Sequence, residues 1–459
     1  MIKFNYFTYA LMNTIIFLPY FLFITIGNSY NTPLHGWFPL IIFYTFKYTG
    51  AFLINSFLQK VKTRELLLGF LILAIFATVC GLLAPLSPIW IELSALLMGI
   101  ATSILLPLYT TIQYHEKYFY ERKMKLKNYV FALLTAIILV FVVLFTAHSN
   151  YPGIAFFIYG AALSVCYISL RHMPQYEISV KPSGDFSKRS FLIFVLFTVL
   201  IFIMKATRET NIQIFIVLLL IGSLTVVAVL TLIITKFKFR LQLPRYIYFF
   251  SFLQGMAVNF CLLYGTFYAL SQKSTTFMMY GIYLPYGLGI IFSLFMGSKI
   301  VKRFNRYHPL SVISVGSVCG LLLTTIPWTI VVGSFFIGFF TSLQARKLNR
   351  FAYDASEIFK DSSLLLRNRW SKLGSMINQI CLVLLILLGS YMNHIPFNQV
   401  FLIITGKTTH YESAMFMTLM ITAITMFVLI GGLLSYGIWR MKEITQYGNE
   451  NIDDQIEGT

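Results

Sequence analysis

The sequence predicts an all-α polytopic membrane protein with about 14 transmembrane helices, and three observations lead to this prediction. Of the 459 residues, 58% are hydrophobic and only 11% are charged, whereas soluble domains carry about 25% charged residues. Apolar runs of about 20 residues, the length that spans a bilayer, recur along the chain. Lys and Arg gather in alternate loops between these runs, which is the pattern that orients membrane proteins.

The apolar runs give the order of the predicted helices. The first run follows Lys3 with no small-residue cleavage site after it, so we interpret it as the first helix and not as a removed signal peptide. The predicted spans are 5–27, 37–58, 65–85, 89–112, 128–148, 153–170, 191–206, 211–235, 246–270, 275–298, 308–326, 328–345, 371–393 and 413–440.

The distribution of charge tests this number of helices. If the N-terminus is cytoplasmic, the inner segments hold 30 of the 35 Lys and Arg residues and the outer segments hold four, with Lys47 inside a helix. One helix wrongly added or dropped in mid-chain would destroy this asymmetry. We therefore expect both termini in the cytoplasm, and we attribute the net charge of +19 to membrane orientation and not to nucleic-acid binding.

The helices divide as six, two and six, with long basic loops at matching positions in the two sets of six. Repeated halves are typical of transporters, whose substrate site lies between the halves near the midplane. The predicted parts are an N-terminal six-helix bundle (1–170), a cytoplasmic linker (171–190), two extra transmembrane helices (191–235), a C-terminal six-helix bundle (246–440) and a disordered cytoplasmic tail (441–459).

Short motifs occupy matched positions in the two halves. Gly50 precedes the basic loop Gln59–Arg64, and Gly297 precedes the stretch Lys302–Arg306 at the equivalent place in the second half. In the fourth predicted span, a stretch that begins at Gly99 leads to Pro107. With these features the chain resembles the major facilitator superfamily, specifically the fourteen-span branch that includes the drug:proton antiporters.

The resemblance implies alternating access between two helix bundles, export as the direction, and the bacterial cytoplasmic (inner) membrane as the location. The sequence departs from the family pattern at Asn13 and Ala95, where an acidic residue and an arginine are usual, and 128–148 lacks a Gly-Pro motif. These departures weaken the assignment as a proton-driven drug exporter. The conformational residues that the resemblance implies are Gly99, Pro107, Gly297, Lys302, Arg303 and Arg306.

Lys47 is the strongest candidate for solute binding. It lies near the middle of the second predicted span, close to Tyr44. A charged Lys at a helix centre costs roughly 2.5–3.5 kcal/mol, so its side chain must face the bundle interior, find a partner or lose its proton. The sequence places no carboxylate at mid-membrane depth, with Glu92 the nearest, so an anionic group of the solute is a reasonable partner. A neutral Lys47, or one that only reaches water, is the alternative.

Polar residues in the ninth predicted span form a second candidate set. Gln254 and Asn259 lie five residues apart, followed by Tyr264, in the first helix of the second half. We predict that these three residues contact the solute. Hydrogen bonding between helices is the alternative for them, and it is the preferred interpretation for Asn378 and Gln379.

The predicted function is that of a secondary active transporter for a small organic solute, anionic or amphipathic, acting as a monomer in the lipid bilayer. We expect no enzyme activity, cofactor or metal, and coupling to a proton or another ion is left open. A flippase for lipid-linked sugars and a membrane-embedded lipid-modifying enzyme are the alternatives. The acidic cluster Asp354, Glu357 and Asp361 would serve the enzyme, but we interpret it as the solvated face of a cytoplasmic helix.

Overall fold

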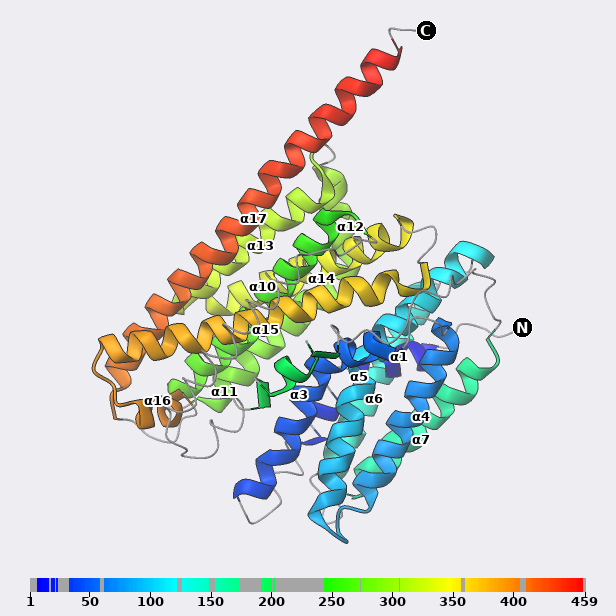
Figure 1. Cartoon of the computed structure of the whole chain (residues 1–459), viewed down its shortest axis with the longest axis vertical. Helices are drawn as coiled ribbons and strands as arrows, with labels where there is room; N and C mark the ends of the chain where they lie inside the picture. Colours follow the sequence, from blue (N-terminus) through cyan, green and yellow to red (C-terminus); the bar gives the residue numbers. More distant parts are fainter. Residues whose placement is uncertain are drawn as a thin grey trace. The chain divides into compact units, whose positions relative to one another are not determined.

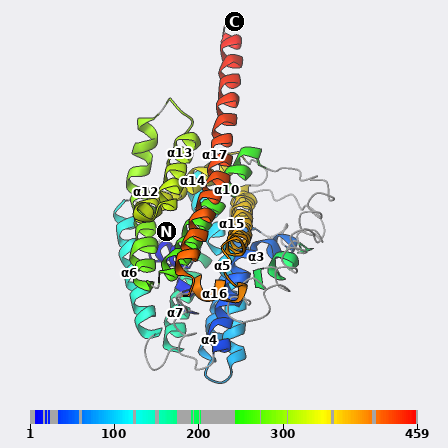
Figure 2. The same cartoon turned by 90° about the vertical axis from the view of Figure 1, so that its left-hand side faces the viewer.

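Figures 1 and 2 show a computed structural model of the chain. The chain forms two compact units, an N-terminal unit (Met1–Arg240 with Ser356–Leu366) and a C-terminal unit (Leu241–Ala355 with Arg367–Thr459). No strand occurs in the described part of the chain. The structure describes residues 6–15, 18–20, 22–23, 33–57, 62–121, 126–147, 153–173, 191–192, 194–199, 201–202, 243–272, 274–304, 306–355, 360–404 and 410–456.

The N-terminal unit is a bundle of long apolar helices that run side by side (Figure 1). Helix α5 packs against α3 and α4, while α7 packs against α4 and α6. The core between them is filled by large buried side chains such as Phe43, Tyr109 and Phe156. The described helices of this unit are α1 (Tyr6–Thr14), α3 (Pro33–Phe57), α4 (Thr63–Leu82), α5 (Pro88–Tyr120), α6 (Leu126–Ala147) and α7 (Gly153–Arg171).

The C-terminal unit is organised around α14, which packs against α10, α12 and α13 (Figure 2). Helix α17 covers α10 and α13. The described elements are α10 (Arg245–Ser271), α11 (Thr275–Phe277), the π-helix η1 (Met278–Tyr283), α12 (Leu284–Arg303), α13 (Pro309–Thr325), the 3-10 turn η2 (Pro327–Thr329), α14 (Ile330–Asp354), α15 (Lys360–Met392) from Arg367 onward, α16 (Phe397–Ile404) and α17 (Glu412–Ile456).

Nine helices in the described part of the chain are long and apolar enough to cross a bilayer, and two shorter apolar helices accompany them. Helix α6 illustrates why lipid must surround them, because Ile138, Phe141 and Phe145 are 62%, 68% and 70% exposed. A continuous exposed apolar face of this kind is unfavourable in water and suits a lipid-facing helix. The chain is therefore an all-helical, multi-pass membrane protein.

The predicted spans between 37 and 170 and between 246 and 440 coincide with helices. The two extra helices, predicted at 191–206 and 211–235, lie largely or wholly outside the described residues. The number fourteen and the six-two-six division therefore stay predictions.

The helix ends extend further than hydropathy indicates. Hydropathy predicts loops at 113–127 and 344–372, but α5 continues to Tyr120, α14 continues to Asp354 and α15 begins at Lys360. Helices α5 and α15 have 33 residues each, about 50 Å at 1.5 Å per residue, whereas the hydrocarbon layer is about 30 Å thick. Polar turns can continue a helix into water because the nucleation cost is already met. For the same reason, the tail predicted as disordered continues α17 as far as Ile456.

Candidate functional site

Lys47 lies on a half-buried face of α3 together with two tyrosines. Tyr44, Lys47 and Tyr48 are spaced by three and four residues, so they share one side of the helix. The hydroxyl oxygens of Tyr44 and Tyr48 are 3.2 Å apart, and the Lys47 ammonium lies 5.5 Å from the centre of the Phe43 ring. This face therefore combines a cation with two phenol groups, which together can donate hydrogen bonds to an anion.

The backbone beneath Lys47 is held against α5 by small residues. A Cβ atom on Gly99 would lie 2.7 Å from the Phe43 carbonyl oxygen and 3.3 Å from the backbone nitrogen of Lys47. One turn further along α3, a Cβ atom on Gly50 would lie 2.7 Å from Ser103 Oγ. Only glycine permits so close an approach. Gly99 thus allows α5 to pack closely against α3 beside Lys47, and its conformational role stays a prediction.

A row of residues on α5 leads from this helix crossing to the end of the helix. Pro107, Thr111 and His115 are spaced by four residues and therefore share one face. The Thr111 hydroxyl donates to the Pro107 carbonyl oxygen at 2.9 Å. Pro107 has no N–H, so the helix lacks one backbone hydrogen bond at this position. Nothing in the structure tests the conformational role predicted for Pro107.

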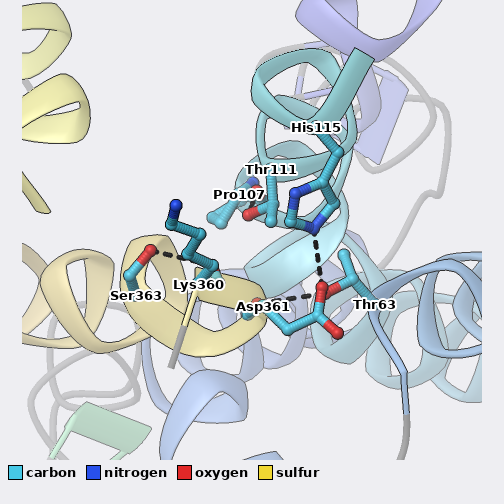
Figure 3. Close-up of polar contacts among 7 residues, drawn as sticks. All are labelled: Thr63, Pro107, Thr111, His115, Lys360, Asp361 and Ser363. Atoms are coloured by element: carbon cyan, nitrogen blue, oxygen red, sulfur yellow. Dashed lines mark hydrogen bonds and ion pairs between the residues drawn. The ribbon is translucent and has the colours of Figure 1, made fainter. Parts of the chain in front are cut away.

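The row ends at a buried polar cluster (Figure 3). The His115 side chain is fully buried, and its Nε2 atom lies 2.6 Å from Asp361 Oδ1. The Thr63 hydroxyl lies 2.8 Å from the same Oδ1 atom and 3.0 Å from the Asp361 carbonyl oxygen, so it donates its one proton to either acceptor. An ionised Asp361 therefore accepts from an imidazole of α5 and a hydroxyl of α4.

Asp361 belongs to the first turn of α15, where the partial positive charge of the helix N-terminus favours a carboxylate. The neighbouring Lys360 ammonium lies 3.7 Å from the centre of the Tyr118 ring on α5, a cation–π contact. Two adjacent residues thus attach the start of α15 to α5. The solvated face predicted for the acidic cluster is wrong for Asp361, whose side chain is only 17% exposed. Asp354 is exposed and paired with Arg350, and Glu357 lies outside the described residues.

Helix α15 contributes to both compact units. Ser356–Leu366 groups with the N-terminal unit and Arg367 onward with the C-terminal unit. Arg367 is buried, and its guanidinium donates to Ser251 Oγ at 3.2 Å and to Gln254 Oε1, both on α10. Hydropathy predicts that Arg367 lies in the basic loop 344–372, because the polar first turns of α15 do not resemble a membrane-spanning helix.

The three residues predicted to bind solute in the C-terminal unit, Gln254, Asn259 and Tyr264, are buried between helices. The Gln254 amide accepts from Arg367 and donates to the Thr341 carbonyl oxygen at 3.3 Å. Asn259 Oδ1 accepts from Asn378 Nδ2 at 2.9 Å, which joins α10 to α15. Tyr264 is buried and stacks on the Phe260 ring. The inter-helix hydrogen bond that we preferred for Asn378 is therefore present.

Gly297, which precedes the basic motif at the end of α12, packs closely against α14. A Cβ atom on Gly297 would lie 2.8 Å from Leu343 Cδ1 and 3.3 Å from Arg346 Nη2. Arg346 in turn donates to the Ser293 carbonyl oxygen at 2.5 Å. The predicted conformational residues Lys302, Arg303 and Arg306 are exposed at the end of this helix.

Sequence reasoning missed the pairing of His115 with Asp361 and the burial of Arg367. The spacing of Pro107, Thr111 and His115 was the available signal, because it places a histidine on the same face as the interrupted part of α5. No group of three His, Cys, Asp or Glu side chains in the described ranges is arranged to hold a metal ion.

The sequence matches no family profile and no curated protein. The fold, however, is similar to solved structures. The crystal structure of the peptide transporter POT in complex with sulfate has a TM-score of 0.55 and 11% identity, and the match covers 95% of this chain and 94% of that chain. An auto-inhibited POT family peptide transporter has a TM-score of 0.50 and 12% identity, and the match covers 95% of each chain.

A third structure, a POT family transporter in complex with a thioalcohol-conjugated peptide, has a TM-score of 0.50 and 13% identity, with 93% of this chain and 96% of that chain covered. A structural likeness at such low sequence identity establishes the fold and leaves the activity open. The chain is thus a multi-pass membrane protein that shares the fold of these solved peptide transporters.

Proposed function

We propose that the chain is a secondary active transporter that moves a small organic solute across the bacterial cytoplasmic membrane by alternating access. The observation that carries the proposal is the likeness to peptide transporters over 95% of this chain and 94% of the solved chain. In transporters built from repeated halves, rocking of the halves exposes a central site to each side in turn. Export as the direction and two cytoplasmic termini are part of the proposal.

Lys47 gives the proposal a solute class. Its half-buried position, on the same side of α3 as Tyr44 and Tyr48, suits an anionic group on a solute that is otherwise apolar. Charged side chains within membrane spans usually face a cavity or pathway. We propose that Lys47 and Tyr44 contact the anionic group. For Gln254, Asn259 and Tyr264, solute binding stays a prediction.

Helix α15 supplies a mechanical constraint on such a cycle. Its first turns are attached to α4 and α5 through Asp361 and Lys360, and the helix is attached to α10 from Arg367 onward. Kinks in helices usually need proline, glycine or a π-bulge, and 360–373 contains neither proline nor glycine. We propose that the cycle releases the His115–Asp361 contact and does not bend α15 at this place.

The test is transport in proteoliposomes with an imposed pH gradient, screened over organic anions and hydrophobic drugs. We expect Lys47→Ala to abolish transport of the anionic substrate while membrane insertion is unchanged. Lys47→Met keeps an unbranched side chain of nearly the same length and should fail equally, because the charge is lost. Lys117→Ala, which removes an exposed lysine of α5, is the matched control and should transport normally. Normal transport by Lys47→Met would refute the role of Lys47, and no gradient-dependent transport of any solute would refute the proposed function.

A further inference from the structure

Helices α10 and α17 pack antiparallel, and aromatic contacts mark both ends of their common length. The Phe249 and Tyr436 ring centres are 6.4 Å apart at one end, and those of Tyr268 and Phe416 are 6.3 Å apart at the other. The contacts are separated by 19 residues along α10 and 20 along α17, about 30 Å at the helical rise. This is the thickness of the hydrocarbon layer.

The exposed face of α17 between these contacts is apolar. Met417, Ile421, Ile424 and Val428 are each more than half exposed. This exposed apolar stripe ends at two aromatic residues, Tyr436 and Trp439, which are 49% and 54% exposed. Tyr and Trp concentrate at the boundary between hydrocarbon and headgroups. The Phe249–Tyr436 contact therefore lies at one membrane surface.

Two exposed arginines lie one turn beyond this contact, one on each helix. Arg245 precedes Phe249 by four residues and Arg440 follows Tyr436 by four residues. The helices are in close contact here, because a Cβ atom on Gly437 would lie 2.8 Å from the Phe249 ring. The two arginines therefore lie at the same level, where lipid phosphates begin.

Arg440 is oriented by the aromatic group next to it. Its Nε atom donates to the Tyr436 hydroxyl at 3.2 Å, and its guanidinium carbon lies 5.8 Å from the centre of the Trp439 ring. The guanidinium group carries a planar set of N–H donors that matches phosphate oxygens, which it can bind with two parallel hydrogen bonds. At the opposite end, four residues before Phe416, α17 carries the acidic Glu412. Because Lys and Arg concentrate on the cytoplasmic side of membrane proteins, we take the arginine end as the cytoplasmic end.

We propose that Arg245 and Arg440, beside Tyr436 and Trp439, bind the phosphate of an anionic phospholipid in the cytoplasmic leaflet. The acyl chains of this lipid would lie along the exposed stripe of α17. The proposal rests on the fold and on the packing of two helices, and it does not depend on transport.

The test is native mass spectrometry of the full chain released from nanodiscs that contain equal amounts of phosphatidylglycerol and phosphatidylcholine. Each basic residue near an anionic surface contributes roughly a fivefold preference, so we expect a preference of roughly thirtyfold for phosphatidylglycerol at this site. Arg245→Gln with Arg440→Gln should remove it, and Arg245→Lys with Arg440→Lys should retain most of it. Excess inorganic phosphate should not displace the lipid, because the acyl chains contribute to binding.

The matched control is Lys117→Gln with Arg171→Gln, which removes two exposed positive charges from the N-terminal unit. This variant should bind phosphatidylglycerol as the unchanged chain does. Equal lipid preference in the Gln variant and the unchanged chain would overturn the proposal, and so would an equal loss in the control. Displacement of the lipid by inorganic phosphate would overturn it in favour of a site for free anions.

Discussion

Separating His115 from Asp361 should weaken the fold more than separating an exposed ion pair of similar chemistry. The perturbation is a double-mutant cycle, with His115→Ala and Asp361→Ala made singly and together. His115 is fully buried, and its Nε2 atom lies 2.6 Å from Asp361 Oδ1. The matched cycle uses Arg350 and Asp354, whose Nε and Oδ2 atoms are 3.3 Å apart and whose side chains are 59% and 57% exposed.

Burial sets the expected size of each coupling energy. A hydrogen bond to a charged group contributes about 1.5–3 kcal/mol, and the His115 side chain is fully buried. We therefore expect a coupling free energy of about 2 kcal/mol between His115 and Asp361. Exposed pairs spaced by four residues on a helix contribute about 0.3–0.5 kcal/mol, so the Arg350–Asp354 cycle should give a value in that range.

The assay is chemical unfolding of the purified chain in detergent micelles near pH 7, followed by tryptophan fluorescence. A cycle isolates the pairwise contribution, because the packing lost in each single variant cancels in the double variant. The contact of Lys360 with Tyr118 remains in every variant, and the Thr63 hydroxyl keeps the carbonyl oxygen of residue 361 as an acceptor when the carboxylate is removed. A coupling energy for His115 and Asp361 no larger than that of the exposed pair would refute the reasoning.

Two further predictions concern a helix crossing and a helix cap. Gly99→Ala should lower the free energy of unfolding by about 1–3 kcal/mol, because the new Cβ atom would lie 2.7 Å from the Phe43 carbonyl oxygen. Gly69→Ala, with nothing within 4 Å, should raise it by about 0.4–1 kcal/mol, and a loss at both positions would contradict the packing argument. Burial lowers the pKa of His308 from its ordinary 6.5, and its side chain accepts from the Leu310 N–H at 3.3 Å. Because the unfolded chain takes up the proton first, stability should fall as the pH drops below about 6.5; in the pH dependence of unfolding, His308→Asn should remove this component, and an unchanged profile would contradict it.

Hydropathy predicted where the helices cross the membrane but not where they end. The apolar windows found α5 and α15, yet their polar turns at Tyr118 and Lys360 look like loop residues in the sequence. A helix may leave hydrocarbon without ending, because its backbone hydrogen bonds continue in water. The contacts of Asp361 therefore could not be predicted, since they depend on those turns being helical.

Part of the candidate site could likewise be predicted from the sequence, and part could not. Lys47 was identifiable because a cation within a long apolar run is rare and costly. The roles of Gln254 and Asn259 depend on partners more than 100 residues away, Arg367 and Asn378. A single sequence does not show which polar side chains meet across helices, so spacing alone could not separate hydrogen bonding within the bundle from contact with a solute.

Labelling from each side of the membrane tests the central claim most directly, namely that the end of α5 and the end of α14 lie on one face of the bilayer. Single cysteines would replace the exposed residues Lys117 and Arg350 in a chain whose natural cysteines are removed. A membrane-impermeant thiol reagent should label both positions in inside-out vesicles and neither in right-side-out vesicles. Labelling of the two positions from opposite sides would contradict the membrane topology and the transporter proposal built on it.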